Sequence, residues 1–166
     1  MYGIPPMSAL VIPLQAVTVE WTGSEGNPTL GAAKFSIPYR SASQYVGVGV
    51  ILPVGADLTG KPLRARVKIA SGFGDPLDLI TNPGGVHLYV KTGASYVYAT
   101  GTYTNLTAIG SWVTIEFDLS TPSFVSMTAG DVFDPKDVRE LGIQFDTSAT
   151  TSTAQPAVVL VDSVGY

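Results

Sequence analysis

LRARVKI, residues Leu63–Ile69, alternates apolar and charged side chains without a break. Successive side chains of a β-strand point to opposite faces, so this stretch predicts a strand with one buried and one polar face. VHLYVK, residues Val86–Lys91, repeats the pattern further along the chain. Segments with the period of an amphipathic helix are missing. The two stretches therefore favour an all-β protein over a βαβ architecture.

Shorter apolar runs between turn-forming residues extend this pattern along the chain. About nine or ten short strands at regular spacing predict one jelly-roll-like sandwich of two antiparallel sheets. One helical turn is expected at Asp134–Leu141, with Asp134 as its N-cap and Pro135 at the first helical position. The expected strands are Val17–Trp21, Ala32–Tyr39, Tyr45–Leu52, Leu63–Ile69, Val86–Lys91, Tyr96–Thr100, Trp112–Leu119, Gly142–Phe145 and Val158–Val164.

The strand pattern also sets the expected domain boundaries. Residues 1–15 are rich in Pro and are expected to form a linker or N-terminal arm, and residues 16–166 a single β-sandwich domain. The polar, low-complexity stretch Thr147–Thr153 predicts a loop. The apolar faces of the strands predict a core that includes Val67, Ile69, Leu88, Val90, Trp112, Phe117, Leu119, Ile143 and Phe145.

Composition excludes several classes of partner. Only 13% of the 166 residues are charged, and the formal net charge is -4. Nucleic acids and anionic membranes both call for a basic surface, so neither is expected as a partner. The chain has no Cys, and no run approaches the roughly 18 apolar residues of a membrane-spanning helix. A neutral ligand is compatible with this charge-poor, acidic composition.

Catalytic motifs are absent from the sequence. His87 is the only His, and neither a Gly-x-Ser-x-Gly elbow nor a phosphate-binding loop is present. A glycosidase needs two carboxyls that face each other across a sugar, a pairing that is set in space. The sequence therefore predicts a non-catalytic protein, with a small glycanase or lyase as an alternative. The carboxylates considered for such a pair are Glu20, Glu25, Glu116, Asp118, Glu140 and Asp146.

Three tyrosines are candidates for ligand binding. Tyr96 and Tyr98 are two residues apart, so they share a face of the expected strand, and Tyr103 follows in the next loop. Sugars present C–H faces that stack on aromatic rings, and the Tyr hydroxyl adds a hydrogen bond. The alternative is that one or two of these rings belong to the core. Tyr45 and Tyr89 are the next candidates if these three rings do not bind.

Polar residues opposite the core residues are a second candidate surface. If their strands are neighbours, they line one sheet face with hydrogen-bonding groups; an ordinary solvated face is the alternative. Gly47 and Gly49 alternate on the outward face of another strand, where they indicate close approach by a ligand or a bulge. The polar residues are Arg64, Arg66, Lys68, His87, Tyr89, Lys91, Gln144 and Asp146.

Several segments resemble, in their order and spacing, β-sandwich carbohydrate-binding modules attached to bacterial glycoside hydrolases. The similarity runs from about Lys34 to the C-terminus. Tyr96, Tyr98 and Tyr103 stand where this pattern usually has Trp, and His87 stands where it usually has Gln. The segments are DLTGKPLRARV (Asp57–Val67), VHLYVK (Val86–Lys91), YVYA (Tyr96–Ala99), YTNL (Tyr103–Leu106), WVTIEFDL (Trp112–Leu119), VRELGIQF (Val138–Phe145) and VLVDSV (Val159–Val164).

The resemblance implies that a concave sheet or its rim binds one glycan chain. The expected function is binding of a β-linked plant cell-wall glucan, such as cellulose chains, xyloglucan or mixed-linkage β-glucan, to target an attached glycoside hydrolase. A mannan- or xylan-binding module and a structural or adhesion sandwich without a sugar site are the alternatives. The expected carbohydrate-binding residues are Tyr96, Tyr98, Tyr103, His87, Tyr89, Lys91, Gln144 and Tyr45.

The resemblance further implies a structural calcium ion between the first and last strands. Asp162 matches the expected ligand, with Glu20 or Glu25 as its partners, and backbone carbonyls would complete the oxygen shell. The alternative is that Asp162 only forms a turn or caps a strand. The protein is expected to be a monomer that is extracellular as part of a larger enzyme. Because its N-terminus lacks the regions of a signal peptide, the chain is expected to be a module of that enzyme.

Overall fold

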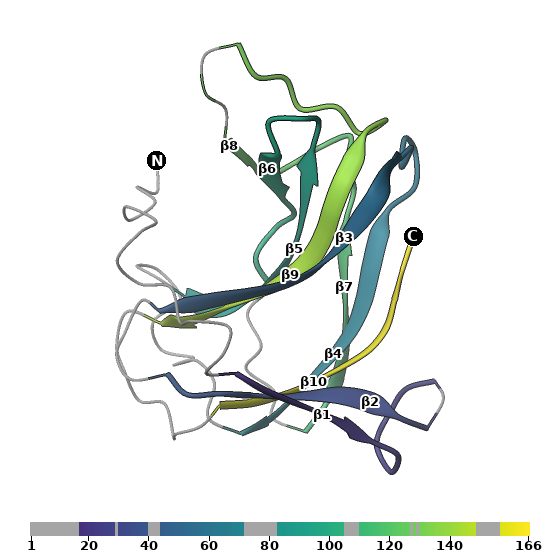
Figure 1. Ribbon diagram of the computed structural model, residues 1–166. Helices are drawn as coiled ribbons and strands as arrows, with labels where there is room; N and C mark the ends of the chain where they lie inside the picture. Colours follow the sequence, from purple (N-terminus) through teal and green to yellow (C-terminus); the bar gives the residue numbers. More distant parts are fainter. Residues whose placement is uncertain are drawn as a thin grey trace.

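The alternating strands assemble into two antiparallel sheets of five strands each, which pack face to face in the computed structural model (Figure 1). The predicted all-β sandwich is therefore confirmed. No helix occurs in the described part of the chain, and hence none that could cross a membrane. The structure describes residues 17–28, 30–39, 44–71, 83–104, 110–126, 128, 130–148 and 157–166.

Sheet I contains the first and last strands of the chain, in the order β1-β2-β10-β4-β7. Each strand pairs antiparallel with its neighbours, so that β10 lies between β2 and β4. Its strands are β1 (Thr18–Thr22), β2 (Ala32–Ile37), β10 (Ala157–Gly165), β4 (Leu63–Ser71) and β7 (Trp112–Phe117).

Sheet II has the order β3-β9-β5-β6-β8, with the long strand β9 at its second position. Both neighbours of β9 are also long, so residues of three strands stand in register across this sheet. Its strands are β3 (Tyr45–Ala56), β9 (Val138–Ser148), β5 (Pro83–Thr92), β6 (Val97–Thr100) and β8 (Phe124–Ser126).

The core forms from the inward residues of both sheets. The rings of Phe35 on β2 and Phe145 on β9 lie 5.9 Å apart and join the two layers. All predicted core residues are buried except Trp112, which is half-buried. Trp112 pairs with Lys68, an outward residue of β4, whereas its neighbour Val113 pairs with the buried Val67. Trp112 thus has the wrong parity for the core, because strand residues alternate between faces.

The expected helical turn at Asp134–Leu141 is wrong. The Asp134 carboxylate accepts a hydrogen bond from the Lys136 N–H at 2.9 Å, but only a single turn follows. Strand β9 begins at Val138, which pairs with Ala56 on β3 and Thr92 on β5, and every residue from Glu140 to Asp146 pairs with both strands. The sequence also missed β8, and it ended β3 too early at Leu52.

Two boundary predictions fall partly or wholly on residues that the structure does not describe. The expected linker at residues 1–15 lies outside the described residues. Of the expected loop Thr147–Thr153, the first two residues belong to β9, and the rest lies outside the described residues.

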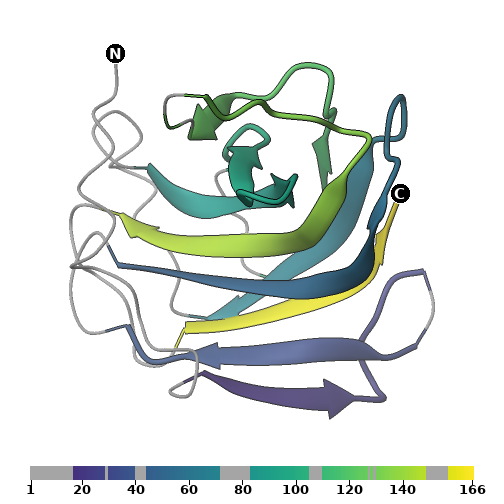
Figure 2. The same ribbon diagram turned by 45° about the horizontal axis from the view of Figure 1, so that its top comes forward.

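Both sheets bend in the same direction, with sheet II on the inside of the bend (Figures 1 and 2). The outward face of sheet II is therefore concave. Outward residues of β3, β9, β5 and β6 are brought onto this concave face by strand alternation. Arg64, Arg66 and Lys68 are not among them, because β4 lies in sheet I. The condition under which these three residues would share a face with His87 and Gln144, that their strands are neighbours, is therefore not met.

Candidate functional site

Polar and aromatic side chains from four strands meet on the concave face of sheet II. Backbone register places His87 on β5 opposite Gln144 on β9, and Gln144 opposite Gly47 on β3. Further along the same face, Lys91 stands between Glu140 on β9 and Tyr98 on β6. These side chains surround a shallow depression of about 310 Å³. The depression is lined by Tyr45, Gly47, Tyr89, Lys91, Tyr98, Glu140 and Gln144.

Tyr89 forms the floor of this depression. Its side chain crosses β9 at Gly142 and reaches β3 at Gly49, so that only 4% of the residue is exposed. A Cβ atom at Gly142 would lie 2.5 Å from the Tyr89 ring, and one at Gly49 would lie 2.4 Å from its hydroxyl. The outward glycines are thus explained by a side chain of the protein itself, and neither a bulge nor a ligand is needed to account for them.

Hydrogen bonds fix the side chains at one end of the depression. The Tyr89 hydroxyl donates to Glu140 Oε1 and Lys91 Nζ donates to Glu140 Oε2, both at 2.8 Å. The Tyr98 ring tilts against the Tyr89 ring with a centroid distance of 5.3 Å. Burial is the main cause that raises the pKa of both Tyr89 and Tyr98, so both hydroxyls stay protonated and can donate.

A second network continues from Tyr98 toward the other end of β9. The Tyr98 hydroxyl donates to Gln144 Oε1 at 2.8 Å and lies 3.2 Å from His87 Nε2. Gln144 Nε2 donates to Asp146 Oδ1 at 3.0 Å, and the Tyr103 hydroxyl donates to Asp146 Oδ2 at 2.7 Å. The orientation of the Gln144 amide is therefore set from both sides.

His87 and Asp146 are a buried titratable pair beneath this network. Burial lowers the pKa of His87 to about 4. Burial also raises the pKa of Asp146 to about 7, although hydrogen bonds from Tyr103 and Gln144 favour its charged form. His87 Nδ1 lies 4.0 Å from Asp146 Oδ2 and makes no hydrogen bond to any described residue. Both groups are therefore neutral in the folded protein at mildly acidic pH.

The structure brings together seven of the eight residues predicted to bind carbohydrate. Tyr103 is held beside His87 by backbone hydrogen bonds between Thr104 and Val86. Its ring meets the His87 ring edge-on at 4.2 Å, and 46% of the residue is exposed. Tyr96 is the exception: it lies in the β5–β6 turn with φ 53°, outside strand β6, so it does not pair with Tyr98 on one strand face.

Glu140 is the contributor that the sequence did not assign to this surface. It was considered only as one half of a catalytic pair. Its spacing held the signal, since Glu140, Gly142, Gln144 and Asp146 alternate along one strand face. This alternation was missed because Glu140, the first of these residues, falls within the expected helical turn.

The three residues expected to hold calcium lie in sheet I and the loop after β1. Glu20 pairs with Lys34 at 3.6 Å, and Glu25 pairs with Lys68. Asp162 Oδ2 accepts a hydrogen bond from the Asn27 N–H at 2.7 Å. The described residues contain no group of three or more acidic, His or Cys side chains that could hold a metal ion. Calcium at Asp162 stays a prediction that would need Glu25 to leave the Lys68 ammonium or backbone carbonyls to supply the ligands.

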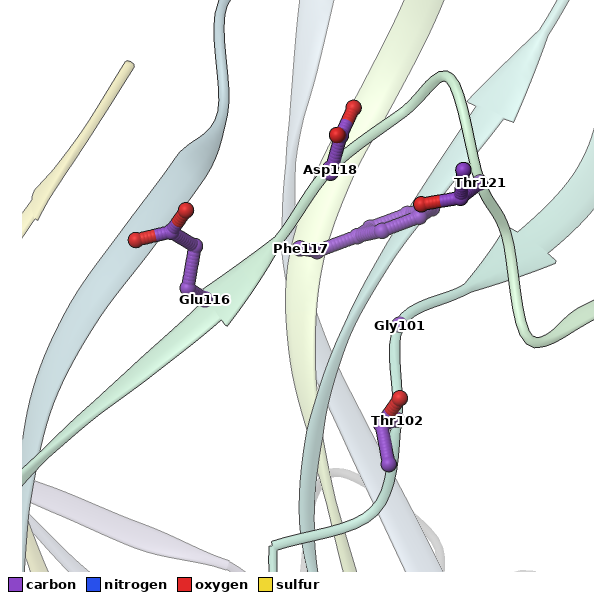
Figure 3. Close-up of a pocket in the computed structure, with 6 residues that line it drawn as sticks. All are labelled: Gly101, Thr102, Glu116, Phe117, Asp118 and Thr121. Carbon is purple, nitrogen blue, oxygen red and sulfur yellow. The ribbon is translucent and has the colours of Figure 1, made fainter.

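A second hollow of about 260 Å³ lies where the end of β7 passes the end of β6 (Figure 3). Its two carboxylates already have partners. Glu116 Oε2 accepts from Arg64 Nε at 2.7 Å, and Asp118 Oδ1 accepts from the Ser120 N–H at 2.8 Å. Gly101 packs against the Phe117 side chain, so the hollow has no aromatic floor that is free to stack a ligand. The concave face is therefore the stronger candidate.

Comparison with known proteins places this surface in context. Residues 15–163 match the model of a family described as mannanase, galactose-binding domain-like. A search of curated protein sequences found no significant match.

Three solved structures share the fold. The family 30 carbohydrate-binding module of a cellulosomal cellulase of Clostridium thermocellum aligns with a TM-score of 0.55 at 14% identity, over 89% of this chain and 80% of its own. The family 11 carbohydrate-binding module from the same organism, in complex with a β-1,3-1,4-mixed-linked tetrasaccharide, gives 0.51 at 14% identity over 89% and 81%. An exo-β-agarase gives 0.56 at 12% identity over 90% of this chain and 22% of its own.

The steric role of the glycines on β3 can be tested by a matched pair of substitutions. Gly49→Ala is expected to destabilise the protein by about 1–3 kcal/mol, because its Cβ would lie 2.4 Å from the Tyr89 hydroxyl. Gly47→Ala should have a much smaller effect, since its Cβ would lie at an ordinary 3.5 Å from the ring. Urea unfolding measures both. If Tyr89→Phe does not partly rescue Gly49→Ala, the hydroxyl is not the obstacle.

The titratable pair predicts opposite pH dependences of stability. The raised pKa of Asp146 contributes stability below about pH 4 that is lost as the pH rises toward about 7. The lowered pKa of His87 contributes stability above about pH 6.5 that is lost as the pH falls toward about 4. These trends oppose each other in the parent protein between about pH 4 and 6.5.

Single substitutions should expose each trend. Relative to the parent, Asp146→Asn should gain stability as the pH rises from about 4 to 6.5, and His87→Gln should lose it over the same window. Urea midpoints at several pH values provide the slopes, which do not depend on how much each variant is destabilised overall. Parallel slopes for the parent and both variants would contradict the assignment.

Proposed function

The chain belongs to the mannanase, galactose-binding-domain-like family, and from this premise we propose that it binds a neutral β-linked plant cell-wall polysaccharide and holds an attached glycoside hydrolase on that polymer. It is a carbohydrate-binding β-sandwich module, like the modules of families 11 and 30 whose fold it shares. The identity of the polysaccharide and the role of the attached enzyme are the parts that we propose. Such a module would act outside the cell, where the polymer is.

The depression on the concave face is the observation that carries this proposal. It combines the Tyr98 ring and the Tyr89 floor with the amide of Gln144, the ammonium of Lys91 and the carboxylate of Glu140. Aromatic faces remove the C–H faces of sugars from water, and polar groups at the rim replace the water that sugar hydroxyls lose. The side chains are held in place by mutual hydrogen bonds, so ligand binding would freeze few of them.

The charges of the face support a neutral ligand. Lys91 Nζ lies 2.8 Å from Glu140 Oε2, so the charges of these two side chains neutralise each other. Asp146 is buried behind Gln144 and Tyr103 and has a raised pKa of about 7. A uronic-acid polymer would meet no unpaired cation among the described residues that line the depression, so its carboxylates would lose hydration without compensation.

Two neutral polymers compete as ligands. The family description names mannanases, which favours β-mannan or glucomannan. The family 11 module is in complex with a β-1,3-1,4-mixed-linked tetrasaccharide, and this complex, like the sequence resemblance, favours β-glucan. We place β-mannan first because family membership covers residues 15–163, whereas the solved structures share only 14% identity.

The carboxylates of this face do not have the spacing of a glycosidase. Glu140 and Asp146 are six residues apart on β9, which corresponds to about 20 Å along a strand. Glycosidase pairs are separated by about 5–10 Å. Asp146 is also buried beneath its two hydrogen-bond donors, where a glycosidic oxygen cannot reach it. This geometry supports a module that binds without hydrolysing.

Affinity electrophoresis and calorimetry test the proposed function. Galactomannan, glucomannan, xyloglucan, mixed-linkage β-glucan and xylan form the panel, and each is also assayed for released reducing ends. At least one of the mannans or β-glucans should retard the protein at moderate affinity, with no product that tracks the protein. Retardation by none of the five polymers would refute carbohydrate binding on this surface, and reducing-end release would refute its non-catalytic character.

Substitutions on the concave face locate the site. Tyr98→Ala should weaken binding about tenfold, because the ring stacks and its hydroxyl positions Gln144. Gln144→Ala should weaken it by about threefold to tenfold, the worth of one or two net hydrogen bonds. Tyr166→Ala is the matched control. Tyr166 is exposed at the end of sheet I, so this variant should bind like the parent. Normal affinity in both test variants would remove the concave face from consideration.

A further inference from the structure

Trp21 is the most exposed aromatic residue of the described chain. It lies near the end of β1, the outermost strand of sheet I, and 73% of it is exposed. Exposing most of an indole ring to water is unfavourable by the same transfer free energy that drives core formation. Its strand partner is the small Ala33, so no large side chain covers the ring from that position.

One side of the Trp21 ring rests on Gly31. A Cβ at Gly31 would lie 2.2 Å from Cζ2 and 3.0 Å from two further ring atoms. Gly31 also has φ +110°, a backbone conformation that residues with a side chain rarely adopt. The six-membered part of the indole is therefore seated on bare backbone, which limits its rotation.

The loop under the ring is tied down at two points. The Gly31 N–H donates to the Glu25 carbonyl at 2.8 Å. The Asn27 N–H donates to Asp162 Oδ2 at 2.7 Å, which links the loop to β10. Trp21 thus stands on a loop that is fixed to the sheet, so the position of its ring is set before any ligand arrives.

Trp112, the other Trp of the chain, has a different environment. It is half-buried on β7, and the Lys68 ammonium lies over its ring at 6.0 Å from the centroid. The Trp112 ring is therefore already in contact with a cation of the protein itself. No cation or aromatic ring from the described residues covers the Trp21 ring in this way.

We propose that Trp21 is a second sugar-stacking site, which binds one or two rings of a neutral polysaccharide away from the concave face. The proposal rests on the proposed function for its ligand class. Trp21 belongs to β1, the edge strand of sheet I, whereas the depression is lined by residues of sheet II, so the same sugar rings cannot occupy both. Two separated contacts would raise the affinity for long or bundled chains more than for short oligosaccharides.

The surroundings of Trp21 favour a sugar over a protein partner. Stable protein interfaces bury about 800 Å² on each side and need a broad continuous surface. On β1 the exposed Val19 and Trp21 alternate with the polar Thr18, Glu20 and Thr22, so the apolar strip is one residue wide. A sugar ring needs only the area of one indole face, which a single exposed Trp provides.

Fluorescence provides a direct test, because the chain has 2 Trp. In Trp112→Phe, Trp21 is the only Trp, and its emission should shift to shorter wavelength and resist iodide quenching when galactomannan or glucomannan is added. Mannohexaose should give the same shift only at higher concentration. An unchanged spectrum at polymer concentrations that retard the same variant in a gel would overturn the proposal.

A binding assay keeps the proposal testable if Trp112→Phe does not fold. Trp21→Ala should reduce retention on galactomannan or glucomannan about fivefold to tenfold, the worth of one stacked ring, and leave calorimetric affinity for mannohexaose within about twofold. Trp21→Phe should restore part of the retention. Leu30→Ala removes an apolar side chain of similar exposure, 79% against 73% for Trp21, and this variant should bind like the parent. Equal retention by Trp21→Ala and the parent would overturn the proposal.

Two outcomes distinguish failure of the proposed function from failure of the Trp21 site alone. If the parent protein binds none of the polymers, the proposed function itself fails, whatever Trp21 does. If Trp21→Ala abolishes a concentration-dependent dimer in sedimentation experiments without changing retention, the ring belongs to a contact between copies of the chain, and the sugar assignment is overturned.

Discussion

The concave face depends on one steric constraint: the Tyr89 side chain lies flat across β9 and β3. The constraint is satisfied because the two residues beneath the ring, Gly142 and Gly49, carry no Cβ. Once the ring lies there, its hydroxyl reaches Glu140, which in turn holds Lys91. The Tyr98 ring then packs on the Tyr89 ring, and the Tyr98 hydroxyl donates a hydrogen bond to Gln144. The two glycines thus allow Tyr89 to form the floor of the depression, and the polar side chains around it are positioned by contacts that start from Tyr89.

The fold followed from the sequence to the extent that strand alternation was unbroken. LRARVKI and VHLYVK predict their strands and their inward faces correctly, because both contain a strict two-residue period. Prediction failed where local chemistry imitated another element. Asp134 and Pro135 resemble the start of a helix, yet the chain after them forms strand β9, which pairs with β3 and β5. Trp112 was assigned to the core by its size, although its parity on β7 points it outward.

The candidate site was predictable within a strand but not between strands. Alternation on β5 placed His87, Tyr89 and Lys91 together, and alternation on a second strand placed Gln144 and Asp146 on its polar face. Which strands are neighbours is decided by tertiary pairing, so the sequence left open whether the Arg64 strand lies beside them, and the structure places it in sheet I. Tyr96 was wrongly grouped with Tyr98 because the turn gives it a positive φ, which breaks the alternation. The role of Gly47 and Gly49 on β3 could not be predicted, because the side chain that lies over them, Tyr89, comes from β5.

The buried pair beneath the rim has a consequence for the proton balance of unfolding. In the folded protein at about pH 5.5, Asp146 holds a proton and His87 does not, because burial shifts their pKa values to about 7 and about 4. In an unfolded chain the order is reversed, since His then has the higher affinity for protons. Unfolding therefore moves one proton from the carboxyl to the imidazole instead of exchanging it with the solvent. The contribution of these two groups to the calorimetric heat of unfolding is then the same in acetate as in a buffer with a large ionisation enthalpy.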